Sequence, residues 1–327
     1  MLNGPLHAQL AVLPEHLQRQ LSAPRGCRGR YAPSPTGRLH LGNLRTALVS
    51  WLMTRLQGGE WLLRIDDLDT PRNRPGAEAS ILRDLTWLGL AWDGPLIRQS
   101  ERRGLYSSVL SSLRRTGQLY PCRCSRRMLA DISAPHGITP VYPGWCREGG
   151  ADWGLRDGRL PSWRLQLNPG SLCWPEPLAT ATGGQCCLDA QSQVGDVVLR
   201  RADGFIAYHL ATAVDELALG ISDVVRGDDL VQATAPQLAV MQALEGQSPR
   251  YWHLPLWRDG DGQRLSKRDG GLDLDGLRAQ GLDAAAVVGR IAATLTLVNP
   301  GSRLSSAELL QVLSLDQLVA ALAGCSP

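Results

Sequence analysis

The sequence contains no apolar run close to the roughly 20 residues that a membrane-spanning helix needs, so we expect no transmembrane helix. Its N-terminus lacks a basic segment followed by an apolar core and a cleavage site, which speaks against a secretory signal. The net charge is only +3, too small to indicate nucleic-acid binding by itself. Internal repeats and low-complexity tracts are absent as well. These absences predict a cytoplasmic globular protein without a membrane partner, and we expect a monomer.

Phenylalanine is scarce, with one residue in 327, but hydrophobic residues make up 43% of the chain. A chain of this length has enough apolar surface to form about two domains. Cysteine, in contrast, is well represented, with eight residues. Because no export signal is visible, we expect reduced thiols rather than disulfides.

The first distinctive stretch reads Arg30-Tyr-Ala-Pro-Ser-Pro-Thr-Gly-Arg-Leu-His-Leu-Gly-Asn43. Two prolines and a glycine stiffen and turn the chain, and helical spacing follows directly over residues 44–57. A turn that delivers His40 and the small Gly42 to the start of a helix suits an anionic ligand such as a phosphate. Taken alone, the stretch is equally compatible with an ordinary loop that carries a chance histidine, because four-residue motifs are weak signals.

A second stretch, Asp259-Gly-Asp-Gly-Gln-Arg-Leu-Ser-Lys-Arg268, is a polar, glycine-rich loop that ends in a basic cluster. In order and in their separation of roughly 220 residues, the two stretches resemble the two signature motifs of class I aminoacyl-tRNA synthetases. The first is similar in detail to the glutamate branch of that family. The resemblance implies that His40 and Lys267 act on the phosphates during catalysis. It also implies that ATP, with Mg²⁺, is bound by His40, Gly42, Asn43, Ser266 and Lys267.

A short apolar run, Trp61–Ile65, follows the helical segment and is typical of a buried strand. Strand, turn, helix and strand form a βαβ unit, which predicts an α/β fold with a Rossmann-type parallel sheet. Ligands in such sheets lie beyond the carboxyl ends of the strands. We therefore expect the histidine turn and the acidic cluster Asp66–Asp69 to share one crevice.

The acidic cluster departs from the family pattern at one position. The glutamate branch has Arg-Ile-Glu-Asp-x-Asp here, whereas this chain carries Asp66 in place of the glutamate. The resemblance implies that this carboxylate meets the ammonium group of the substrate, and the aspartate side chain is one methylene shorter. The same residues are also typical of a capped loop, which is the interpretation we favour for Asp69.

The second half of the chain contains Val224-Val-Arg-Gly-Asp-Asp-Leu230, which indicates a strand, a glycine turn and a helix over 231–245. Most arginines lie on the surface, but Arg226 follows Tyr208 by eighteen residues, as in the glutamate branch. Arginine forks suit the two carboxylates of glutamate. The resemblance implies that L-glutamate is bound by Arg30, Ser34, Asp66, Tyr208 and Arg226.

A cysteine cluster lies between these halves, as Cys122-Arg-Cys124 followed by Tyr142-Pro-Gly-Trp-Cys146. Thiolates are natural ligands of Zn²⁺, which prefers four donors in a tetrahedron. Three cysteines leave one position for His136 or Tyr142, and ligand statistics favour the histidine. The spacing alone also fits three unconnected buried thiols.

Short members of the glutamate branch have the same Cys-x-Cys and Tyr-x-x-x-Cys pattern, with the tyrosine oxygen on zinc. The resemblance therefore implies one structural Zn²⁺ held by Cys122, Cys124, Tyr142 and Cys146. The other internal cysteines, Cys173, Cys186 and Cys187, show no partner spacing, and we expect them to be structural.

Composition divides the chain into five predicted parts. They are an N-terminal extension (1–27), a Rossmann first half (28–119), an inserted zinc-binding subdomain (120–195), a Rossmann second half (196–271) and a C-terminal helical region (272–327). About 55 residues follow Gly271, whereas full glutamyl-tRNA synthetases continue with a long anticodon-binding region. The chain thus resembles the truncated glutamyl-queuosine tRNA(Asp) synthetases. These proteins activate glutamate without tRNA and esterify it to queuosine at the wobble position of tRNA(Asp).

Three other functions fit parts of the sequence less well. A true glutamyl-tRNA synthetase is disfavoured by the short C-terminal region. An inactive paralogue that serves as a tRNA-binding module is disfavoured by the intact His40 and Lys267. A cysteine-type ligase or general nucleotidyltransferase is disfavoured because a thiol-selective synthetase would place zinc in the amino-acid pocket, whereas here the cysteines lie in the insertion. The acceptor itself is not decided by the sequence.

Overall fold

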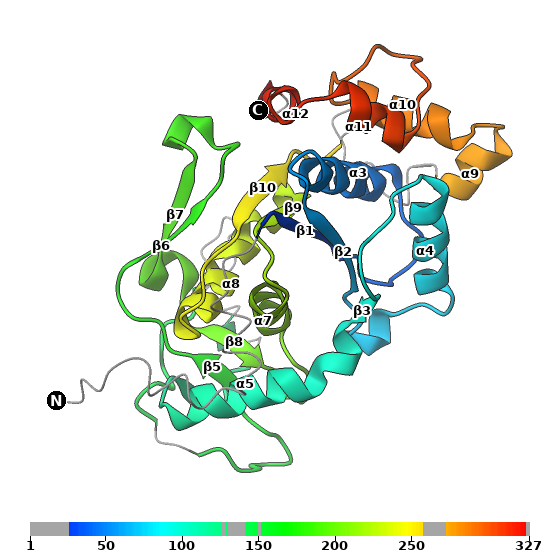
Figure 1. Ribbon diagram of the computed structural model, residues 1–327. Helices are drawn as coiled ribbons and strands as arrows, with labels where there is room; N and C mark the ends of the chain where they lie inside the picture. The colour runs from blue at the N-terminus through cyan, green and yellow to red at the C-terminus, as the bar shows by residue number, and fades with distance from the viewer. Residues whose placement is uncertain (1–25, 126–127, 130–140, 150–151, 258–272, 325–327) are drawn as a thin grey trace.

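A five-stranded parallel sheet forms the centre of the protein (Figure 1). The computed structural model describes residues 26–125, 128–129, 141–149, 152–257 and 273–324. In sheet order, the strands are β10 (Arg250–Leu254), β9 (Asp223–Gly227), β1 (Arg28–Tyr31), β2 (Glu60–Ile65) and β3 (Ile97–Arg98). Every neighbouring pair runs parallel. The predicted α/β fold with a parallel sheet is confirmed.

The chain extends this sheet in two directions from β1. Strands β2 and β3 follow on one side, and β9 and β10 later occupy the other side. The connections therefore diverge at the boundary between β1 and β9. In open α/β sheets, the carboxyl ends of the strands at such a reversal leave a crevice in which ligands bind.

Helices cover both faces of the sheet, and the alternation of side chains along the strands explains why two cores form. Trp61, Leu63 and Ile65 of β2 face one core, whereas Leu62 packs against the other. The first core contains α3 (Leu41–Arg55), α4 (Ala77–Trp87), α9 (Leu274–Ala279), α10 (Ala284–Ala293), α11 (Ser306–Val312) and α12 (Leu315–Gly324). The second contains α5 (Arg103–Arg115), α7 (Tyr208–Leu219) and α8 (Val231–Ala243).

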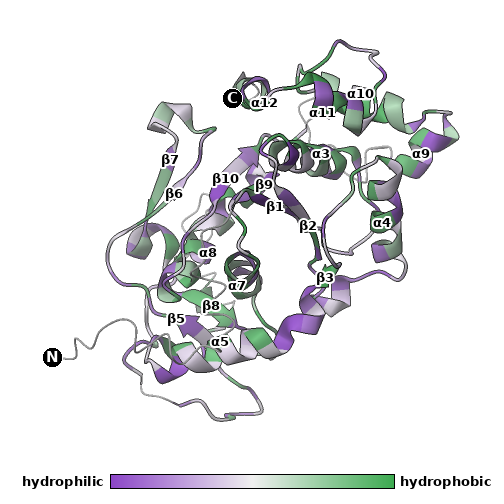
Figure 2. Ribbon diagram, viewed as in Figure 1, coloured by the Kyte–Doolittle hydropathy of each residue, from purple (hydrophilic) through white to green (hydrophobic). Residues whose placement is uncertain are grey.

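The hydropathy of the helices matches this arrangement. Polar and apolar residues alternate along α5 (Figure 2), and its apolar residues Tyr106, Val109, Leu110 and Leu113 are buried. No single described helix is long and apolar enough to cross a membrane. Helices α11 and α12 meet that test only as a pair bent by 100°, and Leu309, Leu318 and Leu322 of this pair are fully buried in the first core.

Two smaller antiparallel sheets lie in the middle of the chain. One has the order β4 (Leu119–Cys122), β5 (Ser162–Leu165) and β8 (Val197–Arg200). The other is the hairpin β6 (Ser171–Pro175) and β7 (Gln185–Asp189). The hairpin packs against α8 and β10, which brings it to the edge of the central sheet. The predicted division of the chain into five parts stays a prediction.

The expectation of reduced thiols is wrong for two cysteines of this hairpin, whereas Cys186 is a free thiol as expected. Cys173 and Cys187 form a disulfide, because they are directly opposite each other in the antiparallel register of β6 and β7. Their Cα atoms are 4.1 Å apart. Sequence spacing missed the pair because the register of a hairpin depends on its turn. Cys27, Cys122, Cys124, Cys146 and Cys186 are free thiols.

The close approach of β1 and α3 depends on Gly29. A Cβ atom at this position would lie 1.9 Å from Oγ1 of Thr54. Thr54 is buried and its hydroxyl donates to the Ser50 carbonyl at 2.8 Å. The hydroxyl could move away from a Cβ atom at position 29 only by losing this hydrogen bond. We expect Gly29→Ala to lower the free energy of unfolding by about 1–3 kcal/mol.

Gly104 in α5 offers a matched control, because a Cβ atom there would meet nothing within 4 Å. Gly104→Ala should leave stability unchanged or raise it by up to about 1 kcal/mol, since alanine favours a helix. Denaturant unfolding of both variants measures the difference. Equal stability of the two would contradict a tight contact between β1 and α3.

Candidate active site

A pocket of about 350 Å³ opens at the carboxyl ends of β1, β2, β9 and β10. Its position is the strand-order reversal described above, where parallel strands place their following loops side by side. The pocket is lined by all eight described residues that the sequence nominates for glutamate and ATP: Arg30, Ser34, His40, Gly42, Asn43, Asp66, Tyr208 and Arg226. The structure brings these side chains together, and their individual roles stay predictions.

His40 is the N-cap of α3. Its Nδ1 accepts the backbone N–H groups of Gly42 and Asn43 at 3.1 and 3.4 Å, and Asn43 Oδ1 accepts the His40 N–H at 3.3 Å. The two amides are therefore engaged by the imidazole of the same turn. A neutral ring that accepts at Nδ1 carries its proton on Nε2, a donor suited to a phosphate oxygen.

Gly42 allows this arrangement. A Cβ atom at Gly42 would lie 3.0 Å from Cε1 and 3.1 Å from Nδ1 of His40, so any larger residue would press against the imidazole. Glycine at position 42 is therefore favoured for a local steric reason: the His40 imidazole lies against the first turn of α3.

The second signature stretch, with Ser266 and Lys267, lies outside the described residues. The described residues on either side of it are Trp257 and Asp273. Trp257 lines the pocket wall. Asp273 forms an isolated antiparallel bridge with His40, and its side chain accepts from Arg38 at 3.1 Å.

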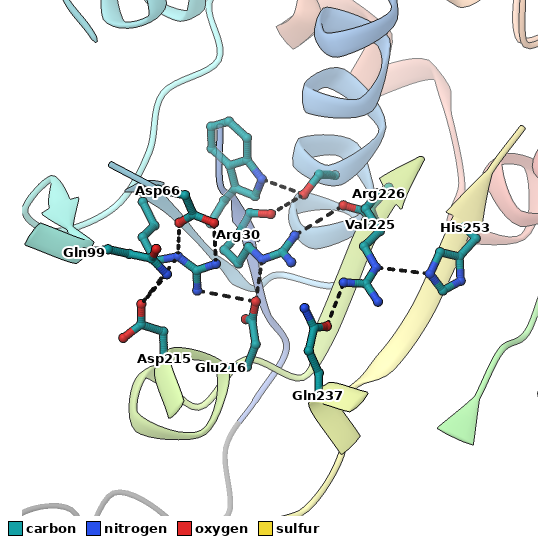
Figure 3. Close-up of polar contacts among 12 residues, drawn as sticks. Arg30, Asp66, Gln99, Asp215, Glu216, Val225, Arg226, Gln237 and His253 are labelled. Carbon is teal, nitrogen blue, oxygen red and sulfur yellow. Dashed lines mark hydrogen bonds and ion pairs between the residues drawn. The ribbon is translucent and has the colours of Figure 1, made fainter. Parts of the chain in front are cut away.

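Arg30 and Arg226 differ in how their charge is balanced. Arg30, at the end of β1, is 5% exposed, and its Nε donates to Glu216 Oε1 at 2.9 Å (Figure 3). Burial by itself raises the pKa of Glu216, but the guanidinium groups of Arg30 and Arg64 hold it below its ordinary value. Arg30 is thus part of a buried ion pair before any ligand binds.

Arg226, at the end of β9, is equally buried, but its contacts are neutral (Figure 3). It donates to His253 Nε2 at 3.1 Å, Gln237 Oε1 at 2.8 Å and Thr234 Oγ1 at 2.7 Å. The Tyr251 ring lies 4.8 Å from its guanidinium carbon. No described carboxylate forms an ion pair with it. A buried cation costs free energy unless it is paired, so this arginine is suited to an anionic ligand.

Asp66 contributes a carboxylate to the pocket wall, opposite in charge to Arg30 and Arg226. Its two oxygens accept from Arg64 Nε and Nη2 at 2.6 and 3.2 Å (Figure 3). Burial raises its pKa above the ordinary value, although Arg64 opposes this. The neighbouring Asp67 is excluded from the pocket wall because its oxygens hold the backbone and hydroxyl of Ser100 at 2.7 and 2.6 Å. Asp66 and Asp229 are the carboxylates among the lining residues.

The cysteine cluster has the geometry of a metal site. The Sγ atoms of Cys122, Cys124 and Cys146 lie within 4.8 Å of one another, and those of Cys124 and Cys146 are 3.6 Å apart. The Tyr142 hydroxyl is 3.5 Å from Cys122 Sγ and 3.6 Å from Cys124 Sγ. Zn–S bonds of about 2.3 Å place tetrahedral ligands somewhat under 4 Å apart. These four residues fit a zinc ion, whereas His136 lies outside the described residues.

The protonation of the thiols bears on metal binding. Burial raises the pKa of the Cys124 thiol to about 11. Burial acts in the same direction on Cys146, but hydrogen bonds from Tyr142 and other neighbours hold its pKa below the ordinary value. Because cysteine binds zinc as the thiolate, metal uptake must release the Cys124 proton.

Several residues that hold the site were missed by the sequence analysis. They are Arg64, Glu176, Glu216, Thr234, Gln237 and His253. Arg64 opens the Arg-Ile-Asp-Asp stretch, where the sequence analysis considered only the carboxylates. The other five belong to no local motif, and they meet because strands and helices far apart in the chain are packed together. For His253, the available signal was the pairing of β9 with β10, whose register makes Arg226 and His253 neighbours.

The fold and the pocket define a class of enzyme. Residues 27–293 match the family described as tRNA synthetases class I (E and Q), catalytic domain. The match covers most of the chain and agrees with the two signature stretches. The protein is therefore a ligase of this class.

Its relatives narrow the class further. The chain is 54% identical over 311 residues to the glutamyl-Q tRNA(Asp) synthetase of Prochlorococcus marinus (strain MIT 9313), which covers 94% of this chain and 95% of the relative. It is 41% identical over 305 residues to the protein of the same name from Symbiobacterium thermophilum, covering 89% and 93%. The chain belongs to this family, as the sequence predicted.

Solved structures agree with this assignment. A glutamate tRNA ligase from Elizabethkingia meningosepticum, crystallised in complex with its amino acid, superimposes with a TM-score of 0.74 at 27% identity. The superposition covers 90% of this chain and 66% of the ligase. The ligase from Elizabethkingia anophelis gives the same TM-score at 26% identity.

Proposed function

We propose that the protein activates L-glutamate with ATP, without tRNA, and transfers the glutamyl group to queuosine at the wobble position of tRNA(Asp). The observation that carries the proposal is the buried Arg226, which contacts only neutral groups and lines the same pocket as Arg30 and Asp66. Two arginine forks suit two carboxylates, and a carboxylate suits an ammonium group. The names of the relatives support the choice of acceptor.

Activation requires no protein nucleophile. An oxygen of the glutamate α-carboxylate attacks the α-phosphorus of ATP, the bond from that phosphorus to the bridging oxygen breaks, and pyrophosphate leaves. A hydroxyl of queuosine then attacks the activated carbonyl, loses its proton and forms an ester as AMP leaves. The protein contributes positioning and charge stabilisation.

In this proposal, His40 donates from Nε2 to a phosphate oxygen, since its Nδ1 is engaged by the helix. Lys267 and Ser266 meet the phosphates from the second signature stretch, and Asn43 and Gly42 shape the wall on the side of α3. Ser34 and Tyr208, both exposed on the pocket wall, add hydrogen bonds to glutamate. Mg²⁺ accompanies ATP as part of the substrate.

The purified protein should catalyse pyrophosphate exchange into ATP that depends on glutamate and occurs with tRNA absent. Labelled glutamate should then be transferred to queuosine-bearing tRNA(Asp) and not to the same tRNA without queuosine. Exchange that begins only after tRNA is added would favour a glutamyl-tRNA synthetase. No exchange under either condition would favour an inactive tRNA-binding paralogue.

Asp66→Asn should reduce kcat/KM for glutamate at least tenfold, because an ammonium group without its charged partner costs about 1–3 kcal/mol. Asp66→Glu should preserve or improve glutamate use. Because burial raises the pKa of Asp66, the parent should lose kcat/KM as pH falls through a value above that of an ordinary aspartate, and Asp66→Asn should lack this limb.

Asp229→Asn is the control for that experiment, because Asp229 is the other carboxylate of the pocket wall. It should retain glutamate use when Asp66 is the ammonium partner. If instead Asp66→Asn behaves like the parent and Asp229→Asn is impaired, Asp229 takes that role.

We also propose that Cys122, Cys124, Tyr142 and Cys146 hold one structural Zn²⁺. The support is the convergence of three sulfur atoms and one phenolic oxygen from two segments about 20 residues apart in the chain. Bound zinc would tie the segment 141–149 to the end of β4, which contributes Cys122. No step of the reaction passes through this metal.

Elemental analysis of the purified protein should find close to one zinc per chain, and Cys124→Ser should lose most of it because a tetrahedral site needs all its ligands. Cys186→Ser is the matched control, since Cys186 is a free thiol of the β6–β7 hairpin. Full metal content in Cys124→Ser would contradict the ligand set, and so would metal loss in both variants.

A further inference from the structure

Glu176 is a buried carboxylate that the proposed reaction does not use. It follows β6 directly and is 5% exposed. Its Oε1 accepts the backbone N–H of His253 at 3.0 Å, and its Oε2 contacts His253 Nδ1 and accepts from Trp174 Nε1 at 3.3 Å. Since β10 is an edge strand, Glu176 satisfies a backbone amide that has no neighbouring strand. Both of its oxygens are engaged, each by a different group of His253.

His253 connects Glu176 to the pocket. It is the register partner of Arg226 in the parallel pair of β10 and β9, so the two side chains lie on one face. Its Nε2 accepts from Arg226 Nε at 3.1 Å, and its ring stacks on Tyr251 with centroids 5.9 Å apart. The carboxylate at Nδ1 requires the proton to be there, which leaves the lone pair on Nε2 facing Arg226 Nε and the Thr234 hydroxyl, the latter 3.3 Å away.

The neutral form of His253 is the one that this arrangement needs. Burial lowers the pKa of His253, and Glu176 only partly opposes the effect. A protonated ring would present an N–H to the Arg226 N–H and place two cations side by side. The neutral Nδ1–H tautomer accepts from Arg226 without adding charge.

Arg226 is then oriented with donors to spare. Of the five N–H groups of a guanidinium, one on Nε, one on Nη1 and one on Nη2 go to His253, Gln237 and Thr234. Among the described residues, one N–H on each terminal nitrogen has no partner, and two such groups suit a carboxylate.

We propose that Glu176 is a positioning residue for substrate recognition: it sets the tautomer of His253, which in turn orients Arg226 toward a carboxylate of the amino acid. This inference rests on the proposed function, because it takes glutamate as the ligand of Arg226. It assigns a role in the amino-acid pocket to the β6–β7 hairpin, which lies outside the central sheet.

Glu176→Gln is a sharp test because it changes one oxygen to an amide nitrogen at nearly constant shape. If the remaining oxygen keeps the backbone N–H of His253, the new NH₂ group faces Nδ1 and turns it into an acceptor. The ring proton then moves to Nε2, which no longer accepts from Arg226 Nε and instead competes with Arg226 Nη2 for the Thr234 hydroxyl. If the oxygen faces Nδ1 instead, the backbone amide of His253 loses its partner.

Two substitutions of His253 distinguish its role as an acceptor that orients Arg226 from its contribution to packing. His253→Gln can place an oxygen near the former Nε2, where it accepts from Arg226 without help from Glu176. His253→Asn has the same amide, but its shorter arm reaches only the former Nδ1. The glutamine variant should therefore stay close to the parent, whereas the asparagine variant should not.

The measurement is the KM for glutamate and for ATP in pyrophosphate exchange, with tRNA included if the parent needs it, together with calorimetric binding of glutamate. Glu176→Gln and His253→Asn should raise the glutamate KM and Kd about tenfold or more. Their kcat and ATP KM should change less than about twofold, because the lost interaction serves substrate binding. His253→Gln should remain within about threefold of the parent, since it keeps an acceptor for Arg226.

A double variant completes the test. In the His253→Gln background, adding Glu176→Gln should cost little, because no tautomer is left to set. The proposal fails if the single Glu176→Gln variant binds glutamate normally, if His253→Gln is as impaired as His253→Asn, or if the two changes simply add. If Glu176→Gln does not fold, the comparison of the two His253 variants still decides. A parent that neither binds glutamate nor exchanges pyrophosphate would instead overturn the proposed function.

Discussion

The pocket depends on the ion pairs of one buried guanidinium, that of Arg64 near the end of β2. Arg64 has no exposed surface, and it contacts three carboxylates: Asp66 at 2.6 Å, Glu216 at 3.4 Å and Asp215 at 3.6 Å. Removing one partner of such a network leaves an uncompensated buried charge, at a cost of about 3–5 kcal/mol. The network therefore ties β2 to α7, which supplies Asp215 and Glu216.

The same carboxylates connect the remaining elements of the site. Glu216 also accepts from Arg30 of β1, and Asp215 accepts from Arg102, Tyr106 and Gln99 at 2.7, 2.9 and 3.1 Å. The cations Arg30, Arg64 and Arg102 thus face the anions Asp66, Asp215 and Glu216 in direct ion pairs. Arg226 stands apart, because its direct contacts are neutral and Glu176 is linked to it only through His253.

This division of charge explains how one pocket can present both signs. Ion pairing anchors Asp66 on one wall, where the carboxylate stays oriented by Arg64. Neutral hydrogen bonds orient Arg226 on another wall without cancelling its charge. An amino acid with a carboxylate side chain has the complementary pattern. Asp66 stands where the family carries glutamate, and Arg64 orients both of its oxygens.

Local patterns in the sequence determined much of this protein. The parallel α/β fold, the helix that begins behind His40, the pocket residues of the motifs and the spacing of Cys122, Cys124, Tyr142 and Cys146 all follow from short stretches of chain. These features can be predicted without the structure because local hydrogen bonding, turn geometry and periodicity depend on residues that are neighbours in the sequence.

Only the tertiary structure decided which distant side chains meet. His253 is 27 residues from Arg226 and 77 from Glu176, and the disulfide of Cys173 and Cys187 depends on hairpin register. The use of two helix amides by His40 depends on a ring rotation that no motif specifies. Contacts of this kind depend on strand order, register and side-chain rotamers. All three are determined by the free energy of the whole packed chain, and no single segment determines them.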